Sequence, residues 1–342
     1  MREPRLTCVL TTIQRPTASV AALAQALEGC EAALLVIGDR KGPTASEFGF
    51  GELFGIERQL KLPFELASRL PENHYSRKNL GYLIAMKQGA TSIYETDDDN
   101  MPLPVWERRS LTVTARPIDA RPWANVYRFF SPDSLLWPRG FPLELANDHE
   151  ACSVGQELPL RRVDAPIQQG LANGAPDVDA IWRLLLGEEH TFGQDRGESV
   201  LLAPGTWCPF NSQSTWWWVA AYPLMYLPSF CSFRMTDIWR SFVAQRCLWE
   251  LGYGVVFHGA EVVQDRNTHN LMRDFQDEIP GYLGNRRMCD LLHDLPLASG
   301  RDAVARNLRR CYEALVDAAF VPAVELALVD AWLADLATVN AD

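Results

Sequence analysis

The first hundred residues alternate between short apolar runs and segments of helical periodicity. The runs LTCVLTTI (6–13), AALLVIGD (32–39) and SIYET (92–96) have the length and composition of buried strands. Helical patterns lie between them, over residues 17–30 and 76–90. This alternation predicts a parallel, doubly wound α/β sheet, in which ligands bind beyond the carboxyl ends of the strands.

The rest of the chain is less regular, but no segment resembles a flexible linker. Residues 125–137 have the composition of strands. We expect a helix capped by Asp177 and a longer helix capped by Thr236. Further amphipathic helices are expected over residues 285–338. The two halves of the chain are therefore expected to share one packed unit.

Composition excludes several classes of protein. The formal net charge of -11 argues against binding to nucleic acid, which depends on basic surface. Eight cysteines without a C-x-x-C pair fit the reduced thiols of a cytoplasmic protein better than a disulfide framework. The apolar stretch TWWWVAAYPLMYLP is well short of the ~20 residues that span a bilayer, so we expect no transmembrane segment. The composition is also compatible with a homo-oligomer.

Three consecutive aspartates, Asp97, Asp98 and Asp99, directly follow the third expected strand. Carboxylates ~5 Å apart repel each other by roughly 1 kcal/mol in water, so they must be solvated or neutralised. In an extended backbone Asp97 and Asp99 point the same way and Asp98 points the opposite way. Two such carboxylates, with waters and substrate phosphates, suit Mg²⁺ or Mn²⁺. A D-x-D pattern also arises by chance, so a solvated acidic loop is the alternative.

Other candidate binding residues lie close to the same edge of the expected sheet. Thr11, Thr12 and Asp39 end the first two strands. Arg77 and Lys78 open the helix that precedes the aspartates, and a helix N-terminus adds partial positive charge that suits a diphosphate. The alternative for both basic residues is a solvated first turn.

Four blocks of the sequence resemble the STELLO-type glycosyltransferases, which are similar to the reversibly glycosylated polypeptides that act as UDP-arabinopyranose mutases. These blocks are SRKNLGYLIAMKQGATSIYETDDDN, PFNSQSTWW, RMTDIWRSFVAQRCLWELG and QDRNTHNLMRDFQDEIPGYL. The resemblance runs from about residue 6 to about residue 283. It implies a GT-A fold over residues 1–283, with a Rossmann-like nucleotide-sugar half (about 1–130) and an acceptor half (about 131–283). Residues 284–342 are expected to form a C-terminal helical appendage.

The resemblance also implies roles for the residues at the sheet edge. Asp97 and Asp99 would hold Mn²⁺ or Mg²⁺ on the diphosphate of a UDP-sugar donor, with Asp98 beside the donor. By the same resemblance, Thr11, Thr12 and Asp39 would border the nucleoside.

His269, in the block QDRNTHNL, is expected to be a third metal ligand, because many GT-A enzymes add a histidine from late in the chain. A nitrogen ligand would favour Mn²⁺ over Mg²⁺. The alternative is an exposed histidine in the first turn of a helix that Thr268 caps.

Asp237, in RMTDIWRS, is the candidate catalytic base, because many inverting GT-A enzymes place an acidic base at the start of a helix in the second half. The alternative is that Asp237 only caps its helix. Arg234 and Arg240 are expected to hold phosphates or to pair with Asp237. Asp177 is explained by capping, so Asp179 is the candidate acceptor-side carboxylate.

One aromatic cluster, Trp216 to Trp218, is expected on a helix, where one ring could face a sugar.

The expected activity is metal-dependent transfer from a nucleotide diphosphate sugar to a glycan, a lipid or a small molecule. One alternative is a nucleotide-sugar mutase, in which an arginine is transiently glycosylated. Another is a non-catalytic nucleotide-sugar-binding or scaffold protein.

Overall fold

The computed structural model describes residues 5–341, apart from 120–121, 132–134, 148–155, 188, 194–196 and 266–269. Four parallel strands form the first part of the sheet, in the order β3-β2-β1-β4. They are β1 (Leu6–Thr12), β2 (Ala33–Gly38), β3 (Glu52–Phe54) and β4 (Ser92–Thr96). The expected doubly wound, Rossmann-like arrangement is confirmed.

Side chains of these strands alternate between two hydrophobic cores. Val9 and Ile37 face the core that contains helix α5 (Lys78–Lys87), while Leu10 faces the core that contains helix α1 (Ala18–Gly29). Helices thus cover both faces of the parallel strands, as their continuous apolar sequences predict.

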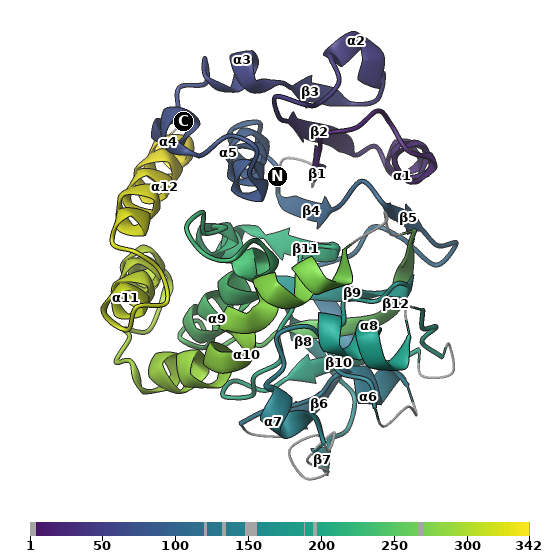
Figure 1. The fold of residues 1–342 in the computed structure, drawn as a ribbon, viewed down its shortest axis with the longest axis vertical. Coiled ribbons are helices and arrows are strands. Elements are labelled where there is room, and N and C mark those ends of the chain that lie inside the picture. Colours follow the sequence, from purple (N-terminus) through teal and green to yellow (C-terminus); the bar gives the residue numbers. More distant parts are fainter. Residues whose placement is uncertain are drawn as a thin grey trace.

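The second half of the chain extends the same sheet with mixed pairing (Figure 1). The path continues from β4 through β11 (Ser214–Trp218), β9 (Ile167–Gly174), β12 (Val256–Gln264), β10 (Ser199–Leu202), β6 (Thr112–Asp119) and β7 (Gln156–Glu157). Two further strands, β5 (Asn100–Pro102) and β8 (Arg161–Asp164), pair with β12 and β6. Since β11 pairs directly with β4, the two halves form one packed unit, as expected.

Besides α1 and α5, the α-helices of at least 7 residues lie in the second half and at the C-terminus. They are α8 (Ala180–Leu186), α9 (Thr236–Trp249), α10 (Leu271–Asp294), α11 (Val304–Asp317) and α12 (Val324–Ala341). Short α-helices are α2 (Ala45–Phe48), α3 (Ile56–Gln59), α4 (Glu65–Arg69), α6 (Tyr127–Phe130) and α7 (Leu143–Ala146). The 3₁₀ turns are η1 (Tyr75–Arg77), η2 (Val219–Met225), η3 (Phe233–Met235) and η4 (Arg301–Ala303).

The C-terminal helices pack along one side of the molecule (Figure 1). Helix α10 runs without a break across residue 283, where the appendage was expected to begin. Helix α11 contacts α9 in the second half, and α12 contacts α4 and α5 in the first half. These helices therefore join the two halves from the outside.

Two segments differ from their expected secondary structure. Residues 127–130 form the short helix α6, whose rings are buried among other aromatic side chains, although the segment was expected to be a strand. Residues 216–218 form part of strand β11 and not of a helix, because they pair with β4 on one side and β9 on the other. Trp216 and Trp217 are both fully buried, so neither can present a ring to a sugar.

Two expected helix caps are also different. Helix α9 follows directly on η3, and Thr236 makes no capping hydrogen bond. Asp179, not Asp177, caps α8, because its carboxylate accepts the N–H of Trp182 at 2.8 Å. Asp177 does not cap α8 and pairs with Arg139.

Candidate functional site

A cavity of about 460 Å³ opens beyond the carboxyl ends of β1, β2 and β4. Most of the expected nucleotide-sugar residues line it: Thr11, Thr12, Asp39, Arg77, Asp97, Asp98, Asp99 and Arg234. Parallel pairing brings these side chains together, because Thr11 lies opposite Ile37 and the last residue of β1 lies opposite Gly38. The position matches the expectation for ligands of open α/β sheets.

The three aspartates occupy a turn, not an extended strand. Strand β4 ends at Thr96, and the N–H of Asn100 closes the turn on the carbonyl of Asp97 at 3.3 Å. The alternation expected from an extended backbone is therefore absent. Asp98 lines the cavity together with Asp97 and Asp99, so the expectation that it points away is wrong.

Each of these carboxylates has hydrogen-bond donors within the protein. Asp97 Oδ1 accepts from Tyr75 Oη at 2.7 Å and from Lys78 Nζ at 3.1 Å. Asp98 Oδ2 accepts from Thr12 Oγ1 at 2.5 Å, and Asp99 Oδ2 accepts from Gln264 Nε2 at 2.9 Å. Burial raises the pKa of Asp97, while Lys78 and Tyr75 act in the opposite direction.

The aspartate turn keeps acceptor capacity for a cation. Asp97 Oδ2 and Asp98 Oδ1 accept no hydrogen bond from the described residues. Carboxylate oxygens beside an open cavity fit a hard divalent ion such as Mg²⁺ or Mn²⁺. Within the described residues, no group of three or more His, Cys, Asp or Glu side chains is arranged to hold a metal. The expected third ligand, His269, lies outside those residues.

The two basic residues at the start of α5 are buried, so the alternative of a solvated first turn is wrong. Lys78 is fully buried and donates to the carbonyl of Thr96 at 2.7 Å as well as to Asp97. Arg77 donates to Gln59 Oε1 at 2.6 Å and to the carbonyl of Leu70 at 3.0 Å. The Nη2 atom of Arg77 is buried and has no hydrogen-bond partner among the residues that the structure describes, and burial lowers the pKa of this guanidinium.

Tyr75 connects the aspartate turn to Asp237. Its hydroxyl lies 2.7 Å from Asp97 Oδ1 and 2.6 Å from Ser212 Oγ. Ser212 Oγ in turn donates to Asp237 Oδ2 at 3.4 Å. Four side chains in close polar contact therefore lie between the donor-side turn and the candidate base, although the two hydroxyl protons can serve only two of the three contacts at a time.

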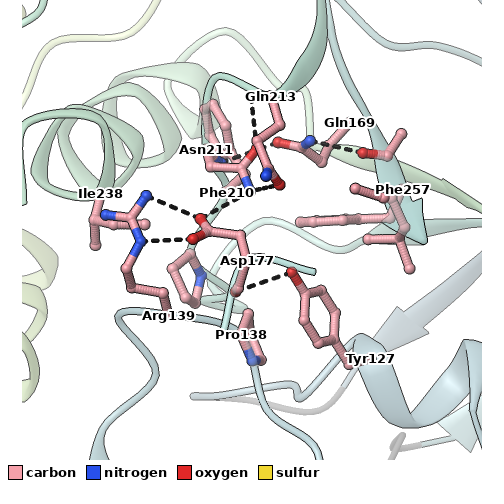
Figure 2. A pocket seen from close by; sticks show the side chains of 14 residues that line it. Tyr127, Pro138, Arg139, Gln169, Asp177, Phe210, Asn211, Gln213, Ile238 and Phe257 are labelled. Carbon is pink, nitrogen blue, oxygen red and sulfur yellow. Dashed lines mark hydrogen bonds and ion pairs between the residues drawn. The ribbon is translucent and has the colours of Figure 1, made fainter. Parts of the chain in front are cut away.

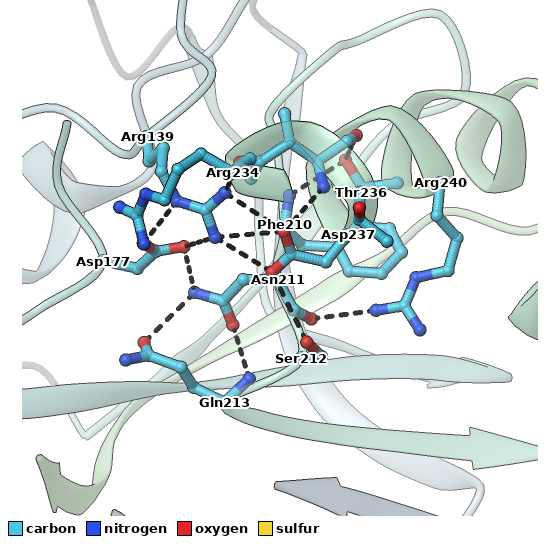
Figure 3. Close-up of polar contacts among 12 residues, drawn as sticks. Arg139, Asp177, Phe210, Asn211, Ser212, Gln213, Arg234, Thr236, Asp237 and Arg240 are labelled. Carbon is cyan, nitrogen blue, oxygen red and sulfur yellow. Dashed lines mark hydrogen bonds and ion pairs between the residues drawn. The ribbon is translucent and has the colours of Figure 1, made fainter. Parts of the chain in front are cut away.

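Asp237 is held by Arg139, a residue that the sequence analysis did not single out. Arg139 Nη2 donates to Asp237 Oδ2 at 2.9 Å, and Arg139 Nε donates to Asp177 Oδ1 at 2.7 Å (Figure 3). All three side chains are buried. Arg139 comes from the loop WPRGFP, whose glycine and prolines are the only sign that its arginine has a fixed position.

A much smaller void of about 10 Å³ borders the same network (Figure 2). Its lining includes Arg139, Asp177, Gln169 and Phe257. This volume holds about one water molecule at most, so the void is not a substrate site.

Of the remaining expected site residues, Arg240 and Asp179 take structural positions and Arg234 lines the cavity. Arg240 pairs with Glu95 at 2.7 Å, and both are fully buried, so Arg240 neither lines the cavity nor pairs with Asp237. Arg234 lines the cavity and its Nε donates to Glu278 at 2.9 Å. Asp179 lies away from the cavity, and burial raises its pKa to about 6.

An exposed ring does line the cavity. Phe233 of η3 is 55% exposed, and its ring lies 6.2 Å from the rings of His74 and of Tyr75. Of the three tryptophans for which a sugar contact was expected, Trp216 and Trp217 are fully buried and Trp218 is half-buried, and none of them lines this cavity.

Comparison with known proteins identifies relatives of this chain. Residues 234–342 match the family model of the STELLO glycosyltransferases. The resemblance to the STELLO family is confirmed. The chain is 27% identical to the probable glycosyltransferase STELLO2 of Arabidopsis thaliana, in an alignment that covers 97% of this chain and 44% of that protein. It is 26% identical to the probable glycosyltransferase STELLO1 of the same plant, over 90% of this chain and 41% of that protein.

The STELLO comparison corrects the expected extent of the resemblance. The family model covers α9 to α12, so the similarity does not stop near residue 283 but includes the C-terminal helices. The chain spans less than half the length of both STELLO proteins. Across the part of the chain that the structure describes, every helix is too short or too polar to cross a membrane.

Proposed function

We propose that this chain is a glycosyltransferase that uses a nucleotide diphosphate sugar, with uridine as the nucleoside. One observation carries the proposal: a STELLO-related chain has a cavity at the carboxyl edge of its parallel strands that gathers Asp39, Arg77 and the three aspartates. The STELLO relatives are themselves named as probable glycosyltransferases, which supports the reaction class.

The nucleoside end of the cavity is assigned to Thr11, Thr12, Asp39 and Arg77. A buried N–H without a partner costs free energy, so donation from Arg77 Nη2 to a ligand carbonyl would be favourable. Asp39 is half-buried on the same cavity, and its carboxylate oxygens can accept a hydrogen bond from an N–H or O–H group of the nucleoside. Uracil carries two carbonyl oxygens, which could accept from Arg77, and an N–H group, which could donate to Asp39.

The diphosphate end is assigned to the aspartate turn. Asp97 and Asp99, with Asp98 beside them, would hold Mn²⁺ or Mg²⁺, and His269 is the proposed third ligand. When bound, the ion would neutralise charge on the leaving diphosphate. Lys78 contributes a fixed positive charge 3.1 Å from Asp97.

The acceptor side is assigned to Asp237. In this proposal its carboxylate takes the proton of an acceptor hydroxyl as that oxygen bonds to the anomeric carbon and the bond to the diphosphate breaks. Arg139 Nη2 lies 2.9 Å from Asp237 Oδ2 and fixes the orientation of this carboxylate. Asp237 is buried and is not among the lining residues of the nucleotide cavity, so an acceptor would reach it from beside that cavity. Phe233, which does line the cavity, offers an exposed ring to the apolar face of a sugar.

A panel of nucleotide sugars with Mn²⁺ tests the function. Release of free UDP together with a new glycoside supports transfer. An isomerised donor would instead indicate a mutase, and binding without turnover would indicate a non-catalytic binding protein. Either of these two results would overturn the proposed reaction.

Site variants test the binding assignment. Asp97→Asn and Asp99→Asn should abolish the Mn²⁺-dependent part of UDP binding in calorimetry. The control is Asp277→Asn on α10, which removes only a surface ion pair with Arg273 and should bind as wild type does. If both site variants bind UDP and Mn²⁺ with wild-type affinity, the metal assignment is wrong.

A further inference from the structure

The C-terminal helix α12 carries two buried carboxylates, and each binds backbone N–H groups of a distant segment. Glu325 accepts the N–H of Phe230 at 2.7 Å and that of Ser229 at 3.1 Å. Asp335 accepts the N–H groups of Glu65 and Leu66 at 2.7 and 3.0 Å. Both carboxylates are at most 3% exposed, so these bonds hold the segments from inside the protein.

The segment that Glu325 binds also contacts the start of α5. Ser229 Oγ donates to Ser76 Oγ at 2.7 Å. Asn79 donates to the carbonyl of Leu227 and accepts its N–H, both at 2.9 Å. Ser76 and Asn79 flank Arg77 and Lys78, so residues 227–230 lie between α12 and the element that supplies those two cations.

The same segment leads directly into a wall of the cavity. Three residues after Phe230 the chain enters η3, whose Phe233 and Arg234 line the cavity. The segment bound by Asp335 reaches the cavity too, because α4 ends next to Leu70, whose carbonyl accepts from Arg77. Both carboxylates of α12 therefore support segments that continue into cavity-lining residues.

We propose that Glu325 and Asp335 are positioning residues, through which α12 fixes the backbone segments that lead into the walls of the nucleotide cavity. The ligand in this proposal rests on the proposed function, but the positioning does not. The positioning role gives α12 a function beyond stability and is consistent with its contacts to α4 and α5. Neither carboxylate lines the cavity, so both act through the segments that they hold.

Asn307 provides a control within the same helical region. Its side chain donates to the carbonyl of Ala298 at 2.7 Å and accepts the N–H of Ala298 at 3.1 Å. This clamp resembles those of α12, because a buried polar side chain holds the backbone of a distant loop. Residue 298 does not line the nucleotide cavity. Asn307→Ala should therefore lower stability without changing the cavity.

Hydrogen exchange and UDP binding in the full chain test the proposal together. Glu325→Gln should speed exchange at residues 227–235 and 75–78, and Asp335→Asn should speed it at 65–70 and 77. Both variants should bind UDP with Mn²⁺ about tenfold more weakly, because part of the binding free energy is then spent on ordering the cavity. Asn307→Ala should change neither readout at the cavity, at a temperature well below every unfolding midpoint.

Each outcome decides one of the two proposals. If Glu325→Gln and Asp335→Asn exchange at cavity residues as the wild type does, the positioning role is wrong, whatever binds there. If the wild type binds no UDP, the proposed function fails, and the exchange data still decide the role of α12. Should Glu325→Gln fail to fold, Asp335→Asn alone carries the test. Equal cavity effects in Asn307→Ala would reduce the role to global stability and overturn the inference.

Discussion

Replacing Asp237 by asparagine should affect stability and transfer separately. The carboxylate accepts from two nitrogens of Arg139, from Ser212 and from the N–H of Ile238. Arg139 is only 5% exposed, so its charge depends on the carboxylates around it. Removing one partner of a buried ion pair costs 3–5 kcal/mol in general. Asp177 remains on Arg139, and asparagine keeps one acceptor oxygen, so we expect a loss near the lower limit, about 3 kcal/mol.

Asp177→Asn is the matched control. Asp177 contacts the same guanidinium and is buried to a similar degree, so its variant should lose a similar free energy of unfolding. It has no proposed role in proton transfer. If Asp237 is the base, only Asp237→Asn should lose transfer, by roughly 10²–10⁴-fold, with UDP binding unchanged.

Urea unfolding followed by tryptophan fluorescence gives the stability of both variants, and the donor found in the nucleotide-sugar panel serves for the transfer assay. Wild-type stability in both variants would show that Arg139 does not depend on these carboxylates. Full transfer activity in Asp237→Asn would leave Asp237 as a structural partner of Arg139 only. Equal loss of transfer in both variants would assign the effect to disruption of the network and not to a base.

Two further predictions concern a metal ligand and a buried cap. His269→Ala should weaken Mn²⁺ binding about tenfold or more and barely change Mg²⁺ binding, because imidazole favours the later metal; equal Mn²⁺ affinity would remove His269 from the site. Burial raises the pKa of Asp179 from 3.8 to about 6, so the folded protein holds this proton more tightly than the unfolded chain does. The contribution of this bound proton to the free energy of unfolding is fully present below pH ~4. It is lost as the pH rises through ~6, which lowers the free energy of unfolding by about 3 kcal/mol. Urea unfolding of Asp179→Asn should lack this decrease, and parallel pH profiles in variant and wild type would contradict the prediction.

The sequence predicted the first half of the sheet well because its signals are local. Each strand over 6–13, 32–39 and 92–96 is a continuous apolar run that ends at polar residues, and the structure has strands there. Parallel pairing then brings Thr11 and Asp39 to the cavity without any knowledge of distant contacts. The orientation of Asp98 was predicted wrongly, because the strand ends one residue before the aspartates and a turn replaces the extended backbone.

The second half was harder to predict because its site depends on contacts between distant segments. Arg139 meets partners 38 and 98 residues further along the chain, a distance that no local pattern reports. The cap of α8 was assigned to Asp177 and not to Asp179 because a cap depends on the exact first residue of the helix, and α8 begins at Ala180. Residues 216–218 were placed on a helix, although their aromatic side chains favour a strand that two neighbours enclose.

The charges around the aspartate turn explain how it can be stable and still attract a cation. Lys78 offsets one of its three carboxylates, and hydroxyl and amide donors stabilise the others. Two negative charges remain beside an open cavity, and one divalent ion would neutralise them. A diphosphate would bring new negative charge, which Arg234 and Lys41 on the same cavity are placed to meet. In the proposed function, the buried lysine would thus reduce the negative charge of the turn to an amount that a single divalent ion could neutralise, which connects the fold of the turn to the proposed donor chemistry.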